Sequence, residues 1–368
     1  QGHMRTPLLL MLSGIALLLL GGIPAVFEFM GMQGFPLNPT ADLFVAHWFL
    51  MIYGFFGTLI GNEIFVALSV EWTGRRADDR LILAFLALTV SGALSFFLNE
   101  ELGLLLVLAA MMVLLHYSKE YLGVSKLGLR PTVYNWLLFS AVMATVAILA
   151  VQASLGYAIP YLNLVFPTGT VLAVMTRDIA LVTGIKPSNL RNWENVVSFA
   201  LLALGLGLMN SAVLLVSWAL SFHASGLYRP KGRRYPIVHL LTAWIYYLIG
   251  SVFTSNYDVF VHAFAVGFLF NTVFGVDVVL MDMLVNAFQT RVSVKPSYVP
   301  FVLLNFGLIM RLLYDFGFNM PIFILSAPLQ GVGILSFFAL TLRQVVFSGK
   351  KGSTEASQKV LSKPRAQK

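Results

Sequence analysis

Long apolar stretches separated by short polar breaks follow one another along the chain from Pro7 to Phe347. Most are about 20 residues long, which is the length at which an α-helix crosses the hydrocarbon core of a bilayer and well beyond that of a barrel strand. Backbone groups inside hydrocarbon must find partners within their own segment, so each stretch is expected to be helical. The pattern predicts an all-α, polytopic membrane protein.

One stretch, from about residue 187 to residue 229, is too long for a single crossing. A turn at 207–210 would divide it into two helices. Residues 4–347 are then expected to form a single transmembrane domain, preceded at 1–3 by a cloning remnant. The twelve predicted helices span about 7–29, 41–70, 80–98, 102–119, 131–155, 160–184, 188–206, 210–229, 235–255, 258–288, 296–316 and 320–346.

The composition agrees with a membrane environment, because 58% of residues are apolar and 11% are charged, and the mean hydropathy is +0.83. Cysteine is absent from the sequence, which excludes disulfides, iron–sulfur clusters and thiolate ligation of haem. The sequence also contains no phosphate-binding loop and no H-E-x-x-H motif. Nothing in it therefore points to the chemistry of a soluble enzyme.

The basic residues are distributed unevenly over the loops that twelve crossings would create. Every Lys and Arg except Arg311 falls on one side, which the positive-inside rule identifies as cytoplasmic. The protein is then expected in the cell membrane, with both termini on its cytoplasmic side. Residues 348–368 carry six cations against Glu355 and are expected to form a disordered basic tail that contacts anionic lipid. No aromatic–basic surface suited to nucleic acid accompanies them.

Five histidines lie in apolar stretches and form two layers by depth. His47 and His262 belong to the outer half of the membrane, whereas His116, His223 and His239 lie toward the cytoplasm. Neutral imidazole is the commonest protein ligand for metals and also holds haem iron. These residues therefore indicate a buried metal or redox centre, and the alternative is hydrogen bonding that only stabilises helix packing.

The chain contains five groups of motifs: Met51–Phe55 with Trp72–Gly74, Gly169 with Thr176–Arg177, Pro236–Trp244, His262–Gly267, and Arg311–Leu313. In order and spacing these motifs resemble those of the NnrS family, whose members are membrane proteins associated with haem, copper and nitric oxide. The resemblance implies twelve helices in a bundle like that of haem–copper oxidases, and a role in nitric oxide response or associated electron transfer. Where the family has H-x-H-E-M, this chain keeps His47 but has Phe49 and Leu50, which removes a ligand and a proton carrier.

His47 and His262 are expected to be the axial ligands of one b-type haem in the outer half, by analogy with haem–copper oxidases, which use the second and tenth helices. Arg311 lies well inside the predicted eleventh helix, where a cation needs an anionic partner. That partner is either a haem propionate or Asp315, one turn further along.

The inner histidines suggest a second centre. His223 and His239 lie on consecutive helices joined by a short basic loop, and His116 would complete a trigonal copper site with them. One alternative is a second haem that bridges two of these histidines. Another is that each ring simply lies at the level of the lipid headgroups and binds no metal.

Glu63 and Asp277 follow the outer histidine of their own helix by 16 and 15 residues, which places both acids at one depth in the inner half. Acids inside the membrane are candidates for function, here a proton path toward the haem. The alternative is a structural pairing with Asn62 or Asn271.

Three functions remain open at this point. The first is a haem protein with nitric oxide or a related oxidant as its small ligand, a respiratory electron donor as partner and, if it is an enzyme, oxidoreductase activity. The second is a secondary transporter that uses Glu63, Asp277 and Arg311 for substrate or coupling ions. The third is an assembly partner of a respiratory complex.

Overall fold

The structure is a computed structural model, and it describes residues 5–184, 189–287 and 294–361. Within these residues all regular structure is helical and no strand occurs. The first half contains α1 (Arg5–Met32), η2 (Ala41–Ala46), α2 (His47–Phe49), η3 (Leu50–Phe56), α3 (Gly57–Asn62), η4 (Glu63–Ala67), α4 (Leu68–Thr73), α5 (Asp79–Phe96), α6 (Glu100–Ser118), η5 (Lys119–Leu122), α7 (Val133–Leu155), η6 (Pro160–Leu164) and α8 (Val165–Thr183).

The second half begins after the residues that the structure leaves undescribed at 185–188. It contains α9 (Asn189–Leu208), α10 (Ser211–Ser225), α11 (Arg234–Val252), α12 (Tyr257–His262), η7 (Ala263–Phe268), α13 (Leu269–Ala287), α14 (Val299–Asp315), η8 (Pro321–Leu325) and α15 (Ser326–Leu361). Of the η segments, η3, η4 and η7 are π-helical and the others are 3₁₀-helical.

Several of these helices are long and apolar enough to cross a membrane. Among the described residues eight qualify, or nine if the bent pair 160–175 and 177–183 is one span. The prediction of an all-helical, multi-pass membrane protein is thereby confirmed, whereas the count of twelve crossings stays a prediction. The eight are Arg5–Met32, Ala41–Thr73, Asp79–Phe96, Glu100–Leu122, Val133–Leu155, Arg234–Val252, Tyr257–Val279 and Pro321–Gln344.

The predicted turn at 207–210 is confirmed, since α9 ends at Leu208 and α10 begins at Ser211. Met209 has a φ of 48°, a left-handed conformation that reverses the chain. Asn210 then caps α10, because its side-chain oxygen accepts a hydrogen bond from the backbone N–H of Val213 at 3.1 Å.

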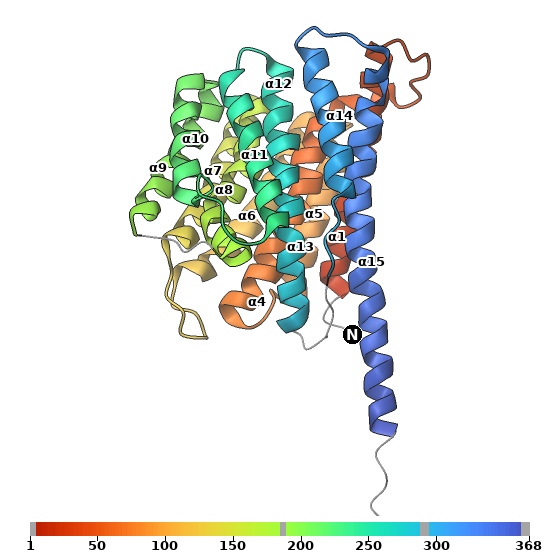
Figure 1. The fold of residues 1–368 in the computed structure, drawn as a ribbon. Helices are drawn as coiled ribbons and strands as arrows, with labels where there is room; N and C mark the ends of the chain where they lie inside the picture. Colours follow the sequence, from red (N-terminus) through yellow and green to blue (C-terminus); the bar gives the residue numbers. More distant parts are fainter. Residues whose placement is uncertain (1–4, 185–188, 288–293, 362–368) are drawn as a thin grey trace, which may run out of the picture.

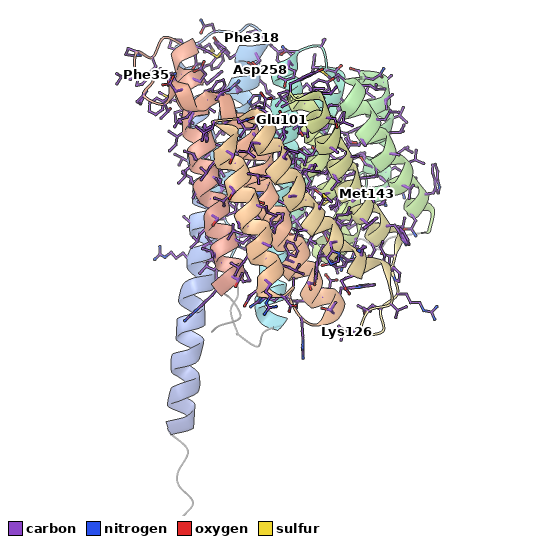
Figure 2. The ribbon with its side chains drawn as sticks, turned by 180° about the vertical axis from the view of Figure 1, so that it is seen from behind. Phe35, Glu101, Lys126, Met143, Asp258 and Phe318 are labelled. Carbon is purple, nitrogen blue, oxygen red and sulfur yellow. The ribbon has the colours of Figure 1, made fainter. Side chains whose placement is uncertain are left out.

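The helices pack side by side in one bundle (Figure 1). We call the end at which α1 ends and α12 begins the upper end, and the end at which α1 begins the lower end. α15 projects beyond the bundle at the lower end. Figure 2 shows Glu101 and Asp258 toward the upper end and Lys126 at the lower end.

The C-terminal segment differs from its prediction. Residues 348–368 were expected to be disordered, but α15 continues to Leu361, and only 362–368 lie outside the described residues. The first proline after Ser348 is Pro364, so no residue before it prevents the backbone from continuing the helix.

Two of the spans are more buried than the rest. In the most apolar 18-residue window, 78% of residues in Tyr257–Val279 and 61% in Ala41–Thr73 are buried, against 33–56% in the other six spans. These two central spans carry His262 and His47, together with all three π-helical segments.

Candidate functional site

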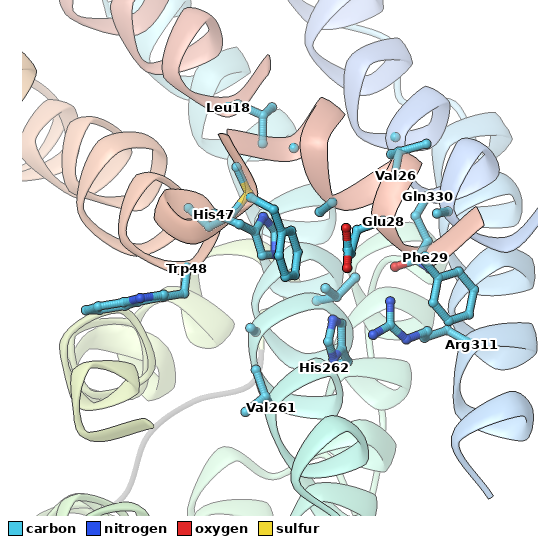
Figure 3. A pocket seen from close by; sticks show the side chains of 18 of the residues that line it. Leu18, Val26, Glu28, Phe29, His47, Trp48, Val261, His262, Arg311 and Gln330 are labelled. Atoms are coloured by element: carbon cyan, nitrogen blue, oxygen red, sulfur yellow. The ribbon is translucent and has the colours of Figure 1, made fainter. Parts of the chain in front are cut away.

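A cavity of about 460 Å³ lies in the upper half of the bundle. Its volume is within the range typical of small-molecule and cofactor sites. His47, His262 and Arg311 all line it, although they come from α2, α12 and α14. Figure 3 shows the two imidazoles and the guanidinium around the same space. The structure therefore brings together the three residues that the sequence predicts as one site.

Each imidazole of this upper cavity is held by a backbone carbonyl. The Nδ1–H of His47 donates to the carbonyl oxygen of Gly21 at 2.8 Å, and the Nδ1–H of His262 donates to that of Asp258 at 2.8 Å. A carbonyl can only accept, so Nδ1 carries the proton in both rings and Nε2 keeps its lone pair. No described residue forms a hydrogen bond with either Nε2. Metal-ligating histidines are held in this way, with the second nitrogen donating to a carbonyl or carboxylate.

The backbone departs from α-helical geometry next to both imidazoles. The π-helical segment η3 begins three residues after His47, and η7 begins directly after His262. π-helical turns are rare and frequently occur at functional sites. Their position beside both imidazoles makes this cavity the leading candidate site of the described residues.

Arg311 is held at the edge of the cavity by three groups. Its Nε donates to Asp315 at 3.4 Å, its Nη2 lies 3.8 Å from an oxygen of Asp258, and its guanidinium carbon lies 4.0 Å from the centre of the Phe29 ring. The predicted contact with Asp315 is confirmed, whereas Asp258 and Phe29 were not expected. Arginine has five N–H donors, so these contacts leave donors for an anion in the cavity.

Glu28 also lines the cavity, although its place in the sequence did not predict this. Its carboxylate accepts a hydrogen bond from the side chain of Asn38 at 3.1 Å, and Figure 3 shows it facing the same space as His47, His262 and Arg311. Because Glu28 is next to the last residue of the predicted first helix, its position indicated an ordinary interfacial acid.

Aromatic rings close the lower side of the upper cavity. Phe56 and Phe270 line it, with ring centres 5.2 Å apart, and Phe55 stacks on Phe270 with ring centres 5.6 Å apart. We call these three rings the aromatic floor. They separate the upper cavity from a second cavity in the lower half of the bundle.

The second cavity measures about 50 Å³. Glu63 and Asp277 both line it, as their common depth in the sequence suggested. Asp178 lines it too. The sequence did not indicate this, because Asp178 directly follows Arg177 near the end of a predicted helix, where a local charge pair is expected. We call the space the acidic cavity.

The alternative of a structural pairing of these acids with Asn62 or Asn271 is not seen among the described residues. The Asn62 side chain donates to the carbonyl of Pro7 at 3.4 Å. Asn271 and Asn305 exchange hydrogen bonds at 2.8 and 2.9 Å. Both amides use other partners, so neither accounts for Glu63 or Asp277.

The three inner histidines are not brought together. His116 is exposed on α6, and His223 pairs with Glu194 at 2.6 Å with its side chain 52% exposed. His239 is fully buried, donates from Nδ1 to the carbonyl of Tyr235 at 2.7 Å and packs against Phe301.

No group of three or more His, Asp or Glu side chains within the described ranges is placed to hold a metal ion. The expected trigonal copper site of the inner histidines is therefore not assembled. The physical reason is helix packing, since α6 packs mainly against α5 and α7, whereas α10 and α11 pack against each other.

The chain matches no protein-family model, no curated protein sequence and no solved structure. The resemblance to the NnrS family thus rests on the sequence motifs alone. The geometry of the two cavities stands independently of it.

Proposed function

We propose that this protein is an NnrS-like haem-binding protein of the cell membrane, with one b-type haem held between His47 and His262 in the outer membrane half. One observation carries the proposal: two imidazoles, each with Nδ1 bound to a carbonyl and Nε2 free, line the same large cavity. Carbonyl-anchored neutral imidazoles are suited to axial ligation of haem iron.

The other walls of the cavity fit the same group. Most of the lining side chains are aliphatic or aromatic, as a porphyrin requires, with Trp48 and Phe44 among them. Phe44 stacks on His47 with ring centres 5.7 Å apart and so helps to fix the ring plane. Arg311 supplies a cation for the propionates at the edge of the cavity. Bound haem would supply reversible one-electron chemistry, or gas binding if one imidazole can be displaced.

The role in nitric oxide response, or in electron transfer associated with it, follows from the NnrS resemblance. Ligation by both histidines favours electron transfer from a respiratory donor. Displacement of one of them favours nitric oxide as ligand and, if the protein is an enzyme, oxidoreductase activity on nitric oxide. Copper is not part of the proposal, because the inner histidines of the described residues do not converge.

The orientation proposed is that of twelve crossings with both termini in the cytoplasm. The basic loops support it, since they lie at the lower end, where α1 begins and α15 projects (Figure 1). The described cations of these loops are Arg75, Arg76, Arg80, Lys119, Lys126, Arg130, Arg229, Lys231, Arg233, Arg234 and Lys295.

The test is an optical spectrum of the purified protein, oxidised and dithionite-reduced, with a pyridine haemochrome assay and nitric oxide added to the same sample. A b-type spectrum with one haem per chain is the expected result. A spectral change with nitric oxide would indicate a displaceable axial ligand, and an unchanged spectrum would indicate electron transfer. Absence of haem after expression with a haem precursor would overturn the proposal.

A secondary transporter is the second candidate, and one observation favours it. The span formed by η6 and α8 bends by 56° between the segments 160–175 and 177–183, and discontinuous helices are typical of transporter binding sites. If the purified protein contains no haem, secondary transport becomes the favoured function. Glu63, Asp277 and Arg311 are then the residues to replace in transport assays.

A further inference from the structure

Three carboxylates from three separate helical segments line the acidic cavity. Glu63 is the first residue of η4, Asp178 follows the bend of α8, and Asp277 lies in α13. The cavity of about 50 Å³ has room for a few water molecules and no more. Charged carboxylates in such a space repel one another and lose hydration, so they cannot all remain ionised without compensation.

An unpartnered hydroxyl points to what provides that compensation. Thr272 is 2% exposed, lines the cavity, and finds no hydrogen-bond partner for its Oγ1 among the described residues. Buried hydroxyls normally find a partner, and in helices they commonly donate to the carbonyl one turn earlier. Thr170, across the cavity, does so by donating to Phe166 at 2.6 Å. The Thr272 hydroxyl is therefore available to a group inside the cavity.

The surrounding charges do not neutralise three carboxylates. Arg177 is the nearby cation, and it forms an ion pair with Glu71 on α4. The hydroxyl of Tyr121 in η5 is neutral and donates to the carbonyl of Ile64 in η4. On α11, which packs against α13, His239 is a neutral donor to the carbonyl of Tyr235. Among the described residues, Arg177 is thus the one cation found near the cluster, and it already pairs with Glu71.

A metal ion is not the group that the geometry favours. Metal-ion ligands must converge on one point, and no such convergence of three His, Asp or Glu side chains occurs in the part of the chain that the structure describes. Protons require no common centre, because each needs only one carboxyl oxygen as donor and a neighbouring oxygen as acceptor.

We propose that Glu63, Asp178 and Asp277 form a proton-holding cluster, in which protonated carboxyl groups donate hydrogen bonds to the remaining carboxylate, to water in the cavity and to Thr272. The cluster adds a third carboxyl group, that of Asp178, to the suggested proton path of Glu63 and Asp277. These residues would then hold protons and not only conduct them. It goes beyond the proposed haem function and requires no haem.

The acidic cavity lies near the aromatic floor along both central spans. Phe56 of the aromatic floor and Leu59 of the acidic cavity are three residues apart, a rise of about 4.5 Å along one helix. On the neighbouring span Phe270 and Thr272 are two residues apart. The walls of the two cavities thus approach each other along both spans, and the aromatic floor lies between them. The imidazoles and the acids themselves are farther apart, since the 16 residues from His47 to Glu63 correspond to about 24 Å of helix.

Infrared spectroscopy of the purified chain tests the cluster. We expect a C=O stretching band of protonated carboxylic acid at neutral pH that shifts in D₂O in the wild type. We expect Asp178→Asn and Asp277→Asn each to reduce or remove this band. Glu101→Gln, which changes an exposed acid at the upper end, is the matched control and should leave the band intact.

Three results would overturn the inference. The first is the absence of a protonated-acid band in the wild type, and the second is a band unchanged in the Asp178→Asn, Asp277→Asn and Glu63→Gln variants. The third is loss of the band on adding Na⁺ at constant pH, which would identify a cation site instead. Because the band and the haem spectrum are separate signals, a haem-free protein with the band would refute only the haem proposal.

Discussion

The upper and lower halves of the bundle contain the same kinds of polar side chain in opposite arrangements. In the upper half the imidazoles of His47 and His262 share one cavity, while Asp258 and Asp315 lie around Arg311. In the lower half the carboxylates share a cavity, whereas the imidazoles lie apart. His116 is at the surface, His223 is hydrogen-bonded to Glu194, and His239 is in the packed core.

The difference follows from the cost of collecting charge in a medium of low polarity. Neutral imidazoles can be grouped around a large apolar space without an electrostatic penalty, and their lone pairs remain available to a ligand. Carboxylates can be grouped in a small space only if protons or cations compensate them. The residue type alone therefore does not define a site, because the shared cavity decides what the residues can do.

The largest effect should come from removing either upper imidazole. His47→Ala and His262→Ala each delete one proposed ligand, and haem content per chain should fall by more than about tenfold, because even outer-shell changes cost that much at metal sites. His116→Ala, which removes an exposed imidazole of the lower half, should leave haem content unchanged. The pyridine haemochrome assay measures all three, and wild-type spectra in both upper variants would contradict the proposed ligation.

A smaller loss should follow from filling the upper cavity without touching a ligand. Gly22 lines the cavity, and a Cβ added there would meet only Met51 Cε at 3.8 Å, so Gly22→Leu should be accommodated and occupy part of the space. Haem content should fall several-fold while the helical circular-dichroism signal is retained.

Gly31→Leu is the matched control for this change, because it lies on the same helix and a Cβ there meets nothing within 4 Å. Equal haem content in the Gly22 and Gly31 variants would show that the cavity is not where haem binds.

The smallest effect on the site is expected at its edge. Arg311→Leu removes a cation that favours the reduced form of the iron, so the midpoint potential should shift downward, by tens of millivolts. The side chain of Asp315, 4% exposed, would lose its partner, and the melting temperature should fall as well. Redox titration measures the first effect, with Arg76→Leu at the lower end as control. An unchanged potential would leave Arg311 with a structural role alone.

The helices were largely predictable because a bilayer demands apolar segments of defined length. The turn at 207–210 could be placed for the same reason, since one segment was twice too long. The depth of a residue also follows from its position in such a helix, which is why His47, His262 and Arg311 were grouped correctly.

Depth does not determine which neighbour a side chain meets. The three inner histidines share a depth, but α6 is not packed against α10 or α11, so His116 could not join His223 and His239. Asp178 and Glu28 were missed for the converse reason, since each joins a site through the packing of helices distant in sequence. Such proximity requires the tertiary arrangement, which one sequence does not contain.

The π-helical segments have a consequence for the relation between the two cavities. A π-helical turn accommodates one residue more than an α-helical turn, and one residue corresponds to a rotation of about 100° around the helix axis. Deleting a single residue within 50–56 would therefore return this turn to α-helical geometry and leave the direction of His47 relative to Glu63 largely unchanged. A deletion within 263–268 would likewise preserve the directions of His262 and Asp277 relative to each other. A single-residue deletion in the α-helical part 57–62 would instead rotate His47 by about 100° relative to Glu63. The π-helical segments are thus the places in the two central spans where a change of length by one residue is best tolerated.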